Sequence, residues 1–311
     1  MKQFRKFVFP TFVFILVTVC CLGQKKDYNK MADPATILWK ITGPQCPKPS
    51  YIIGTMHLAD AGWLLKYPEI TKVIDSTKFI LSEAFTTKPA VQKVARRHLL
   101  KAVPLLDRNQ FVMLDSFFVA KVGEGIRNNK DAEDMTVAEM KSIILTTLVA
   151  DSTKPNGVTR FIDKQLFDLY VTLGREGDNL DIPEKSDFDS SEVDLAKKYI
   201  AKTIKYVEHS DKPDWNIYQM KNLDKTIAQY KQMSVEYSLD VSTAETKPSD
   251  NPDFIPMEQR NKNWMPKITA RISSQPTLIA VGQAHLRYKT GIIMLLRGQG
   301  YTVEPVMMKK H

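Results

Sequence analysis

The chain has 311 residues, with 44 Lys and Arg against 35 Asp and Glu, and its formal net charge is +9. With 43% hydrophobic and 25% charged residues, its composition is that of a globular protein and excludes a disordered, a collagen-like or a polytopic membrane chain. The length allows one large domain or two smaller ones, each with a substantial hydrophobic core.

A signal-like segment comes first in the chain. Three basic residues precede the apolar run 7–19, and a Cys-Cys-Leu-Gly sequence follows it. This order is typical of a secretory signal peptide, and the run is short for a membrane span. We predict cleavage after Gly23 and a secreted or periplasmic protein, with a retained membrane anchor as the alternative. Lipoprotein processing at Cys20 or Cys21 is disfavoured because Val19 and Cys20 stand before them.

The mature chain would carry a modest charge and one cysteine. Cleavage removes three basic and no acidic residues, which leaves 41 basic against 35 acidic residues. Because this excess is spread along the chain, we predict no nucleic-acid partner, and membrane contact only through the signal segment. Cys46 has no second cysteine to pair with, and its place between Gln45 and Pro47 argues against a nucleophilic role.

Strands and helices alternate in the first third of the mature chain. After a polar lead-in at 24–34, we predict strands at 37–42, 51–57 and 78–85, and helices at 68–76 and 89–102. This alternation favours parallel strands joined by right-handed crossovers.

The middle and the end of the chain differ in the spacing of their apolar residues. Apolar residues recur every three or four positions between 105 and 240, which predicts helices, most clearly at 135–148, 161–173 and 193–207, before a polar loop at 238–253. Alternation then returns, with a helix at 257–272 that Pro266 should kink, a strand at 277–281, a helix at 290–297 and a strand at 301–306.

These elements predict an α/β fold, with mixed α+β as the alternative. Both ends of the chain would build one central, largely parallel sheet in a single domain at 35–308. The helical middle, 105–240, would pack on it as a cap or an inserted layer. No internal repeat is evident.

Two of the five histidines close a Gly-x-x-His sequence directly after a predicted strand. They are His57 and His285, and Glu83 ends a third strand. Because the carboxyl ends of parallel strands face one crevice, the three side chains should meet there. Two imidazoles and a carboxylate suit one divalent ion, Mn²⁺, Co²⁺, Zn²⁺ or Fe²⁺, that could activate a water molecule. Alternatively, each histidine donates to a backbone carbonyl, and Glu83 pairs with a Lys or Arg.

The other histidines and glycine motifs of the chain indicate no functional site. His98, His209 and His311 are expected at the surface, and the Gly123–Gly125 pair lacks the rest of a dinucleotide-binding sequence. The chain has neither a Gly-x-Ser-x-Gly elbow nor a His-Glu-x-x-His helix, which removes the commonest serine hydrolase and zinc protease signatures.

Four blocks of sequence resemble the TraB/GumN family, in order and across most of the mature chain. They are residues 49–57, 81–83, 258–264, and 281–285 with Gly291 and 300–303 behind them. The family includes the Tiki-type metalloproteases, in which paired Gly-x-x-His sequences and an acidic residue are associated with Mn²⁺- or Co²⁺-dependent peptide cleavage. The resemblance implies that His57, Glu83 and His285 bind a divalent ion and that Glu83, Arg260 and Asn261 act in catalysis.

The chain departs from the family pattern at two positions. Gln259 stands where the family often has Glu before the Arg-Asn pair, and Asp181 stands where it often has Glu after Leu. Asp181 keeps the charge with a shorter reach. Glu258 is a doubtful substitute for the missing neighbour, because it points about 100° away from position 259 on a helix.

Arg260 and Trp264 lie four positions apart and share a face of the predicted helix. Arg260 could clamp a substrate carboxylate or stabilise an oxyanion. It could equally form a salt bridge to Glu83 or another acid, with Trp264 filling the core.

We therefore predict a secreted or periplasmic metal-dependent hydrolase, and we favour a peptidase with a peptide or protein substrate. Glu83 could serve as a ligand or as a general base beside the ion. Two rivals use the same crevice. One is a non-catalytic protein that binds a peptide or an envelope component, and the other is a metal-free hydrolase with a His and Glu pair.

Overall fold

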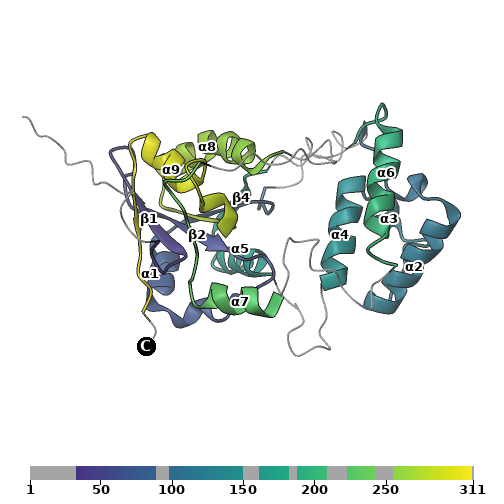
Figure 1. Cartoon of the computed structure of the whole chain (residues 1–311), viewed down its shortest axis with the longest axis horizontal. Helices are drawn as coiled ribbons and strands as arrows, with labels where there is room; N and C mark the ends of the chain where they lie inside the picture. Colours follow the sequence, from purple (N-terminus) through teal and green to yellow (C-terminus); the bar gives the residue numbers. More distant parts are fainter. Residues whose placement is uncertain are drawn as a thin grey trace, which may run out of the picture. The chain divides into compact units, whose positions relative to one another are not determined.

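The computed structural model describes residues 33–88, 98–149, 161–181, 188–208, 223–242 and 255–309 (Figure 1). Several predictions concern residues outside these ranges: the signal segment, almost all of the lead-in, residues 89–97 of a predicted helix, most of the 238–253 loop, His209 and His311.

A six-stranded sheet forms the centre of the fold, in the order β4-β3-β5-β2-β1-β6. The strands are β1 (Leu38–Thr42), β2 (Ser50–Thr55), β3 (Phe79–Ser82), β4 (Glu176–Asn179), β5 (Thr277–Gly282) and β6 (Thr302–Pro305). Strands β4, β3, β5 and β2 run parallel, whereas β1 is antiparallel to both of its neighbours. The loop after β1 is too short for a crossover, so β1 and β2 pair as a hairpin. The predicted α/β fold, with a largely parallel sheet built from both ends of the chain, is confirmed.

Nine α-helices lie in the described part of the chain. They are α1 (Pro68–Ser76), α2 (Arg108–Val122), α3 (Lys130–Glu133), α4 (Val137–Val149), α5 (Ile162–Thr172), α6 (Val193–Ile204), α7 (Leu223–Lys231), α8 (Met257–Ser274) and α9 (Ile292–Gly298). Helix α1 begins at Pro68, whose fixed φ suits the first helical position. Helix α8 continues through Pro266. None of these helices is both long and apolar enough to cross a membrane.

One prediction of secondary structure is wrong, and one strand was not predicted. Residues 98–102 form no α-helix, since Leu99 and Lys101 make isolated β-bridges to Asp189 and Thr136. The helical middle also contains the strand β4, whose residues Glu-Gly-Asp-Asn have low strand propensity. Pairing with β3 and side-chain contacts of Asp178 hold this strand, so tertiary contacts override the local preference.

Helices α5 and α8 cover opposite faces of the sheet. Neighbouring side chains of a strand point to opposite sides, and two neighbouring positions of β4 face the two helices. On β4, a Cβ atom at Gly177 would lie 2.4 Å from the ring of Phe167 on α5, so this position needs glycine. The carboxylate of Asp178, the next residue, accepts a hydrogen bond from Lys88 at 2.6 Å and lies 3.0 Å from Lys267 of α8. Figure 1 shows α5 and α8 on different sides of the strands.

The described residues form two hydrophobic cores. The sheet core joins Leu81 and Ile279 to residues of α5 and α8, including Tyr170 and Ile268. A second core joins residues of α2, α4 and α6, among them Leu114, Ile144 and Ile200. The helical middle therefore contributes to both cores, α5 to the first and α2, α4 and α6 to the second.

Replacing Asp178 with Asn should reduce the free energy of unfolding by about 1–3 kcal/mol at pH 7. The amide removes the negative charge of a 1% exposed side chain that Lys88 and Lys267 contact. Burial alone would raise the pKa of Asp178, but Lys88 and Lys267 outweigh it and lower the pKa below its unfolded value. The stabilisation is therefore complete above the unfolded pKa and disappears as the pH falls through the folded pKa. Urea unfolding at pH 7 and at pH 3 measures this.

The matched control is Asp168→Asn. It makes the same substitution at a carboxylate that is 53% exposed and pairs with Lys164 at the surface. Its effect should stay within about 0.5 kcal/mol at both pH values. A difference between wild type and Asp178→Asn that is equal at pH 7 and pH 3 would contradict the ionic origin.

Candidate functional site

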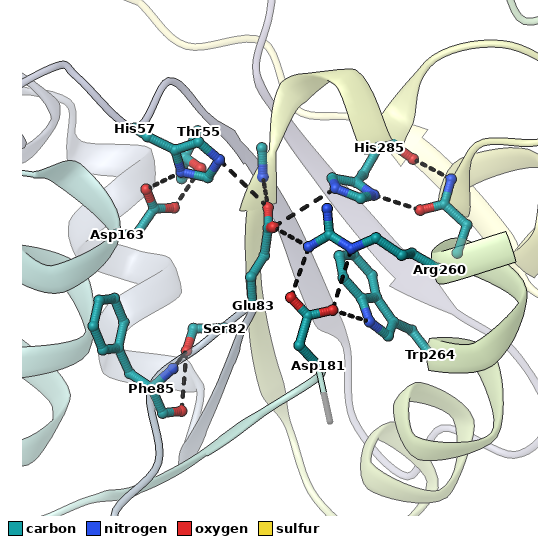
Figure 2. A network of polar contacts seen from close by, with 12 residues as sticks. Thr55, His57, Ser82, Glu83, Phe85, Asp163, Asp181, Arg260, Trp264 and His285 are labelled. Carbon is teal, nitrogen blue, oxygen red and sulfur yellow. Dashed lines mark hydrogen bonds and ion pairs between the residues drawn. The ribbon is translucent and has the colours of Figure 1, made fainter. Parts of the chain in front are cut away.

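The three predicted side chains lie near the carboxyl ends of β2, β3 and β5. Thr55, the last residue of β2, pairs with Gly282, the last residue of β5, and Ser82 of β3 pairs with Ala280. Glu83 directly follows β3, His57 lies two residues after the end of β2, and His285 lies in a short 3₁₀ helix, Gln283–Leu286, after β5. The register of the sheet therefore brings the three predicted residues together (Figure 2).

Glu83 lies between the two histidines. His57 Nε2 is 3.7 Å from Glu83 Oε1, and His285 Nε2 is 3.6 Å from Glu83 Oε2. Both distances exceed a hydrogen bond, so the two nitrogens face the carboxylate without being bonded to it. The Glu83 side chain is 13% exposed and the His285 side chain 4%, whereas the His57 side chain is 49% exposed. Solvent therefore reaches the site from the side of His57.

Two strong donors hold the Glu83 carboxylate. The backbone N–H of Gly282 donates to Oε1 at 2.7 Å, and Arg260 Nη2 donates to Oε2 at 2.7 Å. Burial alone would raise the pKa of Glu83, but His285, His57, Arg260 and the Gly282 N–H together lower it to about 2. Glu83 is therefore a carboxylate at neutral pH.

Arg260 links Glu83 to Asp181. Its Nε and Nη2 atoms donate to the two oxygens of Asp181 at 3.2 and 2.7 Å, and its guanidinium lies 4.8 Å from the Trp264 ring centre. Trp264 is 2% exposed and donates from Nε1 to Asp181 at 3.0 Å. The salt bridge to Glu83, one of the two predicted alternatives, is observed. Asp181 binds Arg260 despite its shorter side chain.

Asn261 fixes the protonation pattern of His285. The amide of Asn261 donates from Nδ2 to the carbonyls of His285 and Thr290, at 3.3 and 2.9 Å, so its Oδ1 is the acceptor for His285 Nδ1 at 2.6 Å. The ring proton must then lie on Nδ1, which leaves a lone pair on Nε2. Burial, partly offset by Glu83, lowers the pKa of His285 to about 4, and the imidazole is neutral at pH 7.

His57 has a carboxylate at the equivalent position. Its Nδ1 atom lies 2.5 Å from Asp163 Oδ2, and Thr55 Oγ1 donates to Asp163 Oδ1 at 2.5 Å. Burial alone would lower the pKa of His57, but the hydrogen bond to Asp163 and the charges of Asp163 and Glu83 raise it to about 9. The two histidines therefore differ in charge at neutral pH when only these side chains surround them.

Sequence reasoning missed Asp163, although a signal for it exists. Asp163 lies in the first turn of α5 and is 7% exposed. It shares the three- and four-residue spacing of the buried residues Leu166, Phe167 and Tyr170, so it is a charged residue at a core position. Such a residue needs a partner, but the sequence does not show that the partner is His57.

The remaining candidates lie elsewhere. Glu258 pairs with Lys262 on the exposed face of α8, and Gln259 donates to Asn263, so neither joins the site. His98 is exposed, as predicted. Cys46 is partly buried, and burial raises the pKa of its thiol, which disfavours the reactive thiolate.

The donor types at the site, imidazole nitrogen and carboxylate oxygen, are ones that divalent cations bind. Two imidazole Nε2 atoms and a carboxylate face one another, and each Nδ1 is tied to an oxygen, an arrangement typical of histidines that bind metal. A Cβ atom at Gly282 would lie 3.1 Å from His57 Nε2 and 3.2 Å from Glu83 Oε1, so glycine keeps this space open. As the side chains stand, the described residues contain no group of three His, Cys, Asp or Glu that is already arranged to hold an ion.

Comparison with known proteins matches the chain to one family. The model of the TraB/PrgY/gumN family matches residues 37–305, which include every residue of the site. No curated protein and no solved structure matches the chain.

Proposed function

This chain belongs to the TraB/PrgY/gumN family, and we propose that it is a metal-dependent hydrolase that cleaves peptide bonds outside the cytoplasm. One observation carries the proposal: both histidines use Nδ1 to bind an oxygen and direct Nε2 at the same carboxylate. Without an ion the raised pKa leaves His57 protonated. A divalent cation would displace that proton and be bound by both Nε2 atoms beside the carboxylate.

The residues that would hold the ion are His57 and His285, through Nε2, and Glu83. When bound, such an ion polarises a carbonyl group and lowers the pKa of water. Imidazole and carboxylate donors suit Mn²⁺, Co²⁺, Zn²⁺ and Fe²⁺, so these are the candidates.

The other residues of the site position groups and carry charge in this proposal. Arg260 and the Gly282 N–H orient the Glu83 carboxylate. Arg260 Nη1 has no hydrogen-bond partner in the described part of the chain, and Figure 2 draws it pointing away from Asp181. We assign it to donate to the substrate carbonyl oxygen, where negative charge develops during hydrolysis. Asn261 lies behind His285 and holds that ring.

Segment 1–23 supports export, and export supports a peptide or protein substrate outside the cytoplasm. The 49% exposure of His57 indicates the side on which a substrate would enter.

A metal-free hydrolase is the second candidate. The observation in its favour is the 2.5 Å contact between Asp163 and His57, since a carboxylate that orients an imidazole is also the arrangement of a general acid–base pair. His57 and Glu83 would then exchange protons with the substrate directly.

The test is the metal content of the purified chain, prepared without a histidine tag and measured by elemental mass spectrometry for Mn, Fe, Co, Ni, Cu and Zn. We expect close to one ion per wild-type chain and none in a folded His57→Ala/His285→Ala double variant. A peptide library should be cleaved by the wild type and left intact after chelation.

Three other outcomes would oppose the proposal. Absence of an ion even after loading with Mn²⁺, Co²⁺ and Zn²⁺ would refute it. Cleavage that survives chelation but fails in Glu83→Gln would favour the metal-free hydrolase. Peptide binding that survives chelation without new termini would favour a binding protein.

A further inference from the structure

The two histidines of the site are restrained by different means. His285 is 4% exposed in its side chain, and its ring packs 4.4 Å from that of Trp264, so packing and Asn261 both hold it. The His57 side chain is 49% exposed. Its Nδ1 contact with Asp163 must therefore provide much of the restraint that packing provides for His285.

Asp163 is well supported for this task. It is 7% exposed, and Thr55 Oγ1 holds its second oxygen at 2.5 Å, which leaves Oδ2 directed at His57. Thr55 lies two residues before His57, so the carboxylate joins α5 to both residues at the end of β2. The first turn of a helix favours a negative charge, which stabilises Asp163 as an acceptor.

We propose that Asp163 is the positioning residue of His57: it accepts from Nδ1–H, orients the ring and thereby directs Nε2 toward Glu83. This inference deepens the proposed function and rests on it for the ion that Nε2 would bind. Acceptors of this kind commonly account for a 10- to 100-fold difference in metal affinity.

The test compares Asp163→Ala, Asp163→Asn and the control Asp168→Asn, which changes an exposed carboxylate on the same helix. Zn²⁺ and Mn²⁺ affinities are measured by competition with a chelating dye. We expect Asp163→Ala to bind about 10- to 100-fold more weakly. Asp163→Asn should stay within a few-fold of wild type, because its amide oxygen can accept from Nδ1–H as Asn261 does for His285. Asp168→Asn should equal wild type.

A second readout needs no metal. In ¹⁵N-resolved NMR of the metal-free chain, the Nδ1–H of His57 should give a proton signal protected from exchange with water in wild type and Asp163→Asn, and no such signal in Asp163→Ala. His285 should give the same signals in all three proteins. If Asp163→Ala does not fold, Thr55→Val, which removes the hydrogen bond to Oδ1, should show a smaller loss of affinity in the same direction.

Wild-type affinity together with wild-type His57 signals in Asp163→Ala would overturn this inference and leave the proposed function intact. Failure of the wild type to bind any ion would instead refute the proposed function, and the NMR readout would still decide the role of Asp163. Equal losses of metal affinity in Asp163→Asn and Asp163→Ala would also overturn the proposed role of Asp163. An oxygen that accepts from Nδ1–H would then not determine the affinity.

Discussion

Replacing Glu83 with Gln is expected to reduce hydrolysis by on the order of 10²–10⁴, whether Glu83 acts as ligand or as general base, and to abolish ion binding in the first case. The amide has nearly the same volume as the carboxylate but lacks its charge and one of its two acceptors. Glu83 accepts from Gly282 N–H and from Arg260, so the amide must turn its NH₂ group toward one of these donors. Kinetics on a cleaved peptide and metal analysis measure both effects.

Glu258→Gln is the matched control, because it makes the same substitution at an exposed residue whose partner is Lys262. It should keep wild-type metal content and activity. If Glu83→Gln retained full hydrolysis, Glu83 would be neither a ligand nor a base, and both hydrolase hypotheses would be excluded.

Arg260→Met is expected to have the second largest effect, with loss of hydrolysis and of stability together. Arg260 is the cation that lies between the carboxylates of Glu83 and Asp181, each 2.7 Å from Nη2. Methionine keeps much of the apolar volume against Trp264 but leaves two negative charges facing each other. We expect a loss of about 2 kcal/mol in unfolding free energy, below the range for fully buried pairs because Arg260 is 27% exposed.

The pair of measurements separates two roles of Arg260. Urea unfolding reports the structural role, and kcat for a peptide reports the proposed contact of Nη1 with the carbonyl oxygen. Loss of one such donor typically lowers kcat by about 10²–10³. Arg127→Met, at a 61% exposed arginine, should change neither quantity appreciably. Unchanged kcat in a folded Arg260→Met variant would remove the oxyanion role.

The sheet and most helices follow from local patterns, because periodicity of two or three to four residues is a property of neighbouring positions. The segment Phe79–Ser82 and the segment Thr277–Gly282 are continuously buried strands, as their composition predicts. Strand β4 could not be predicted in this way. Its residues are polar, and its stability comes from β3 and from the lysines around Asp178.

The residues of the site divide in the same way, into those that a local sequence pattern predicts and those that only tertiary contacts bring in. His57, Glu83 and His285 could be found because each follows a recognisable strand and each is a residue type that binds cations. Arg260 could be found only as a candidate with two roles, since its partners are far away in sequence. Asp163 and Asn261 reach their histidines across 106 and 24 positions, and no local pattern pairs them.

The sequence by itself thus determined which groups stand at the ends of the strands and which chemistry their types allow. Only the tertiary structure decided how those groups are oriented. The orientation of an imidazole depends on the acceptor of its Nδ1–H, and that acceptor comes from α5 for His57 and from α8 for His285. Because packing of distant helices against the sheet sets these contacts, the direction of each Nε2 atom is a property of the fold.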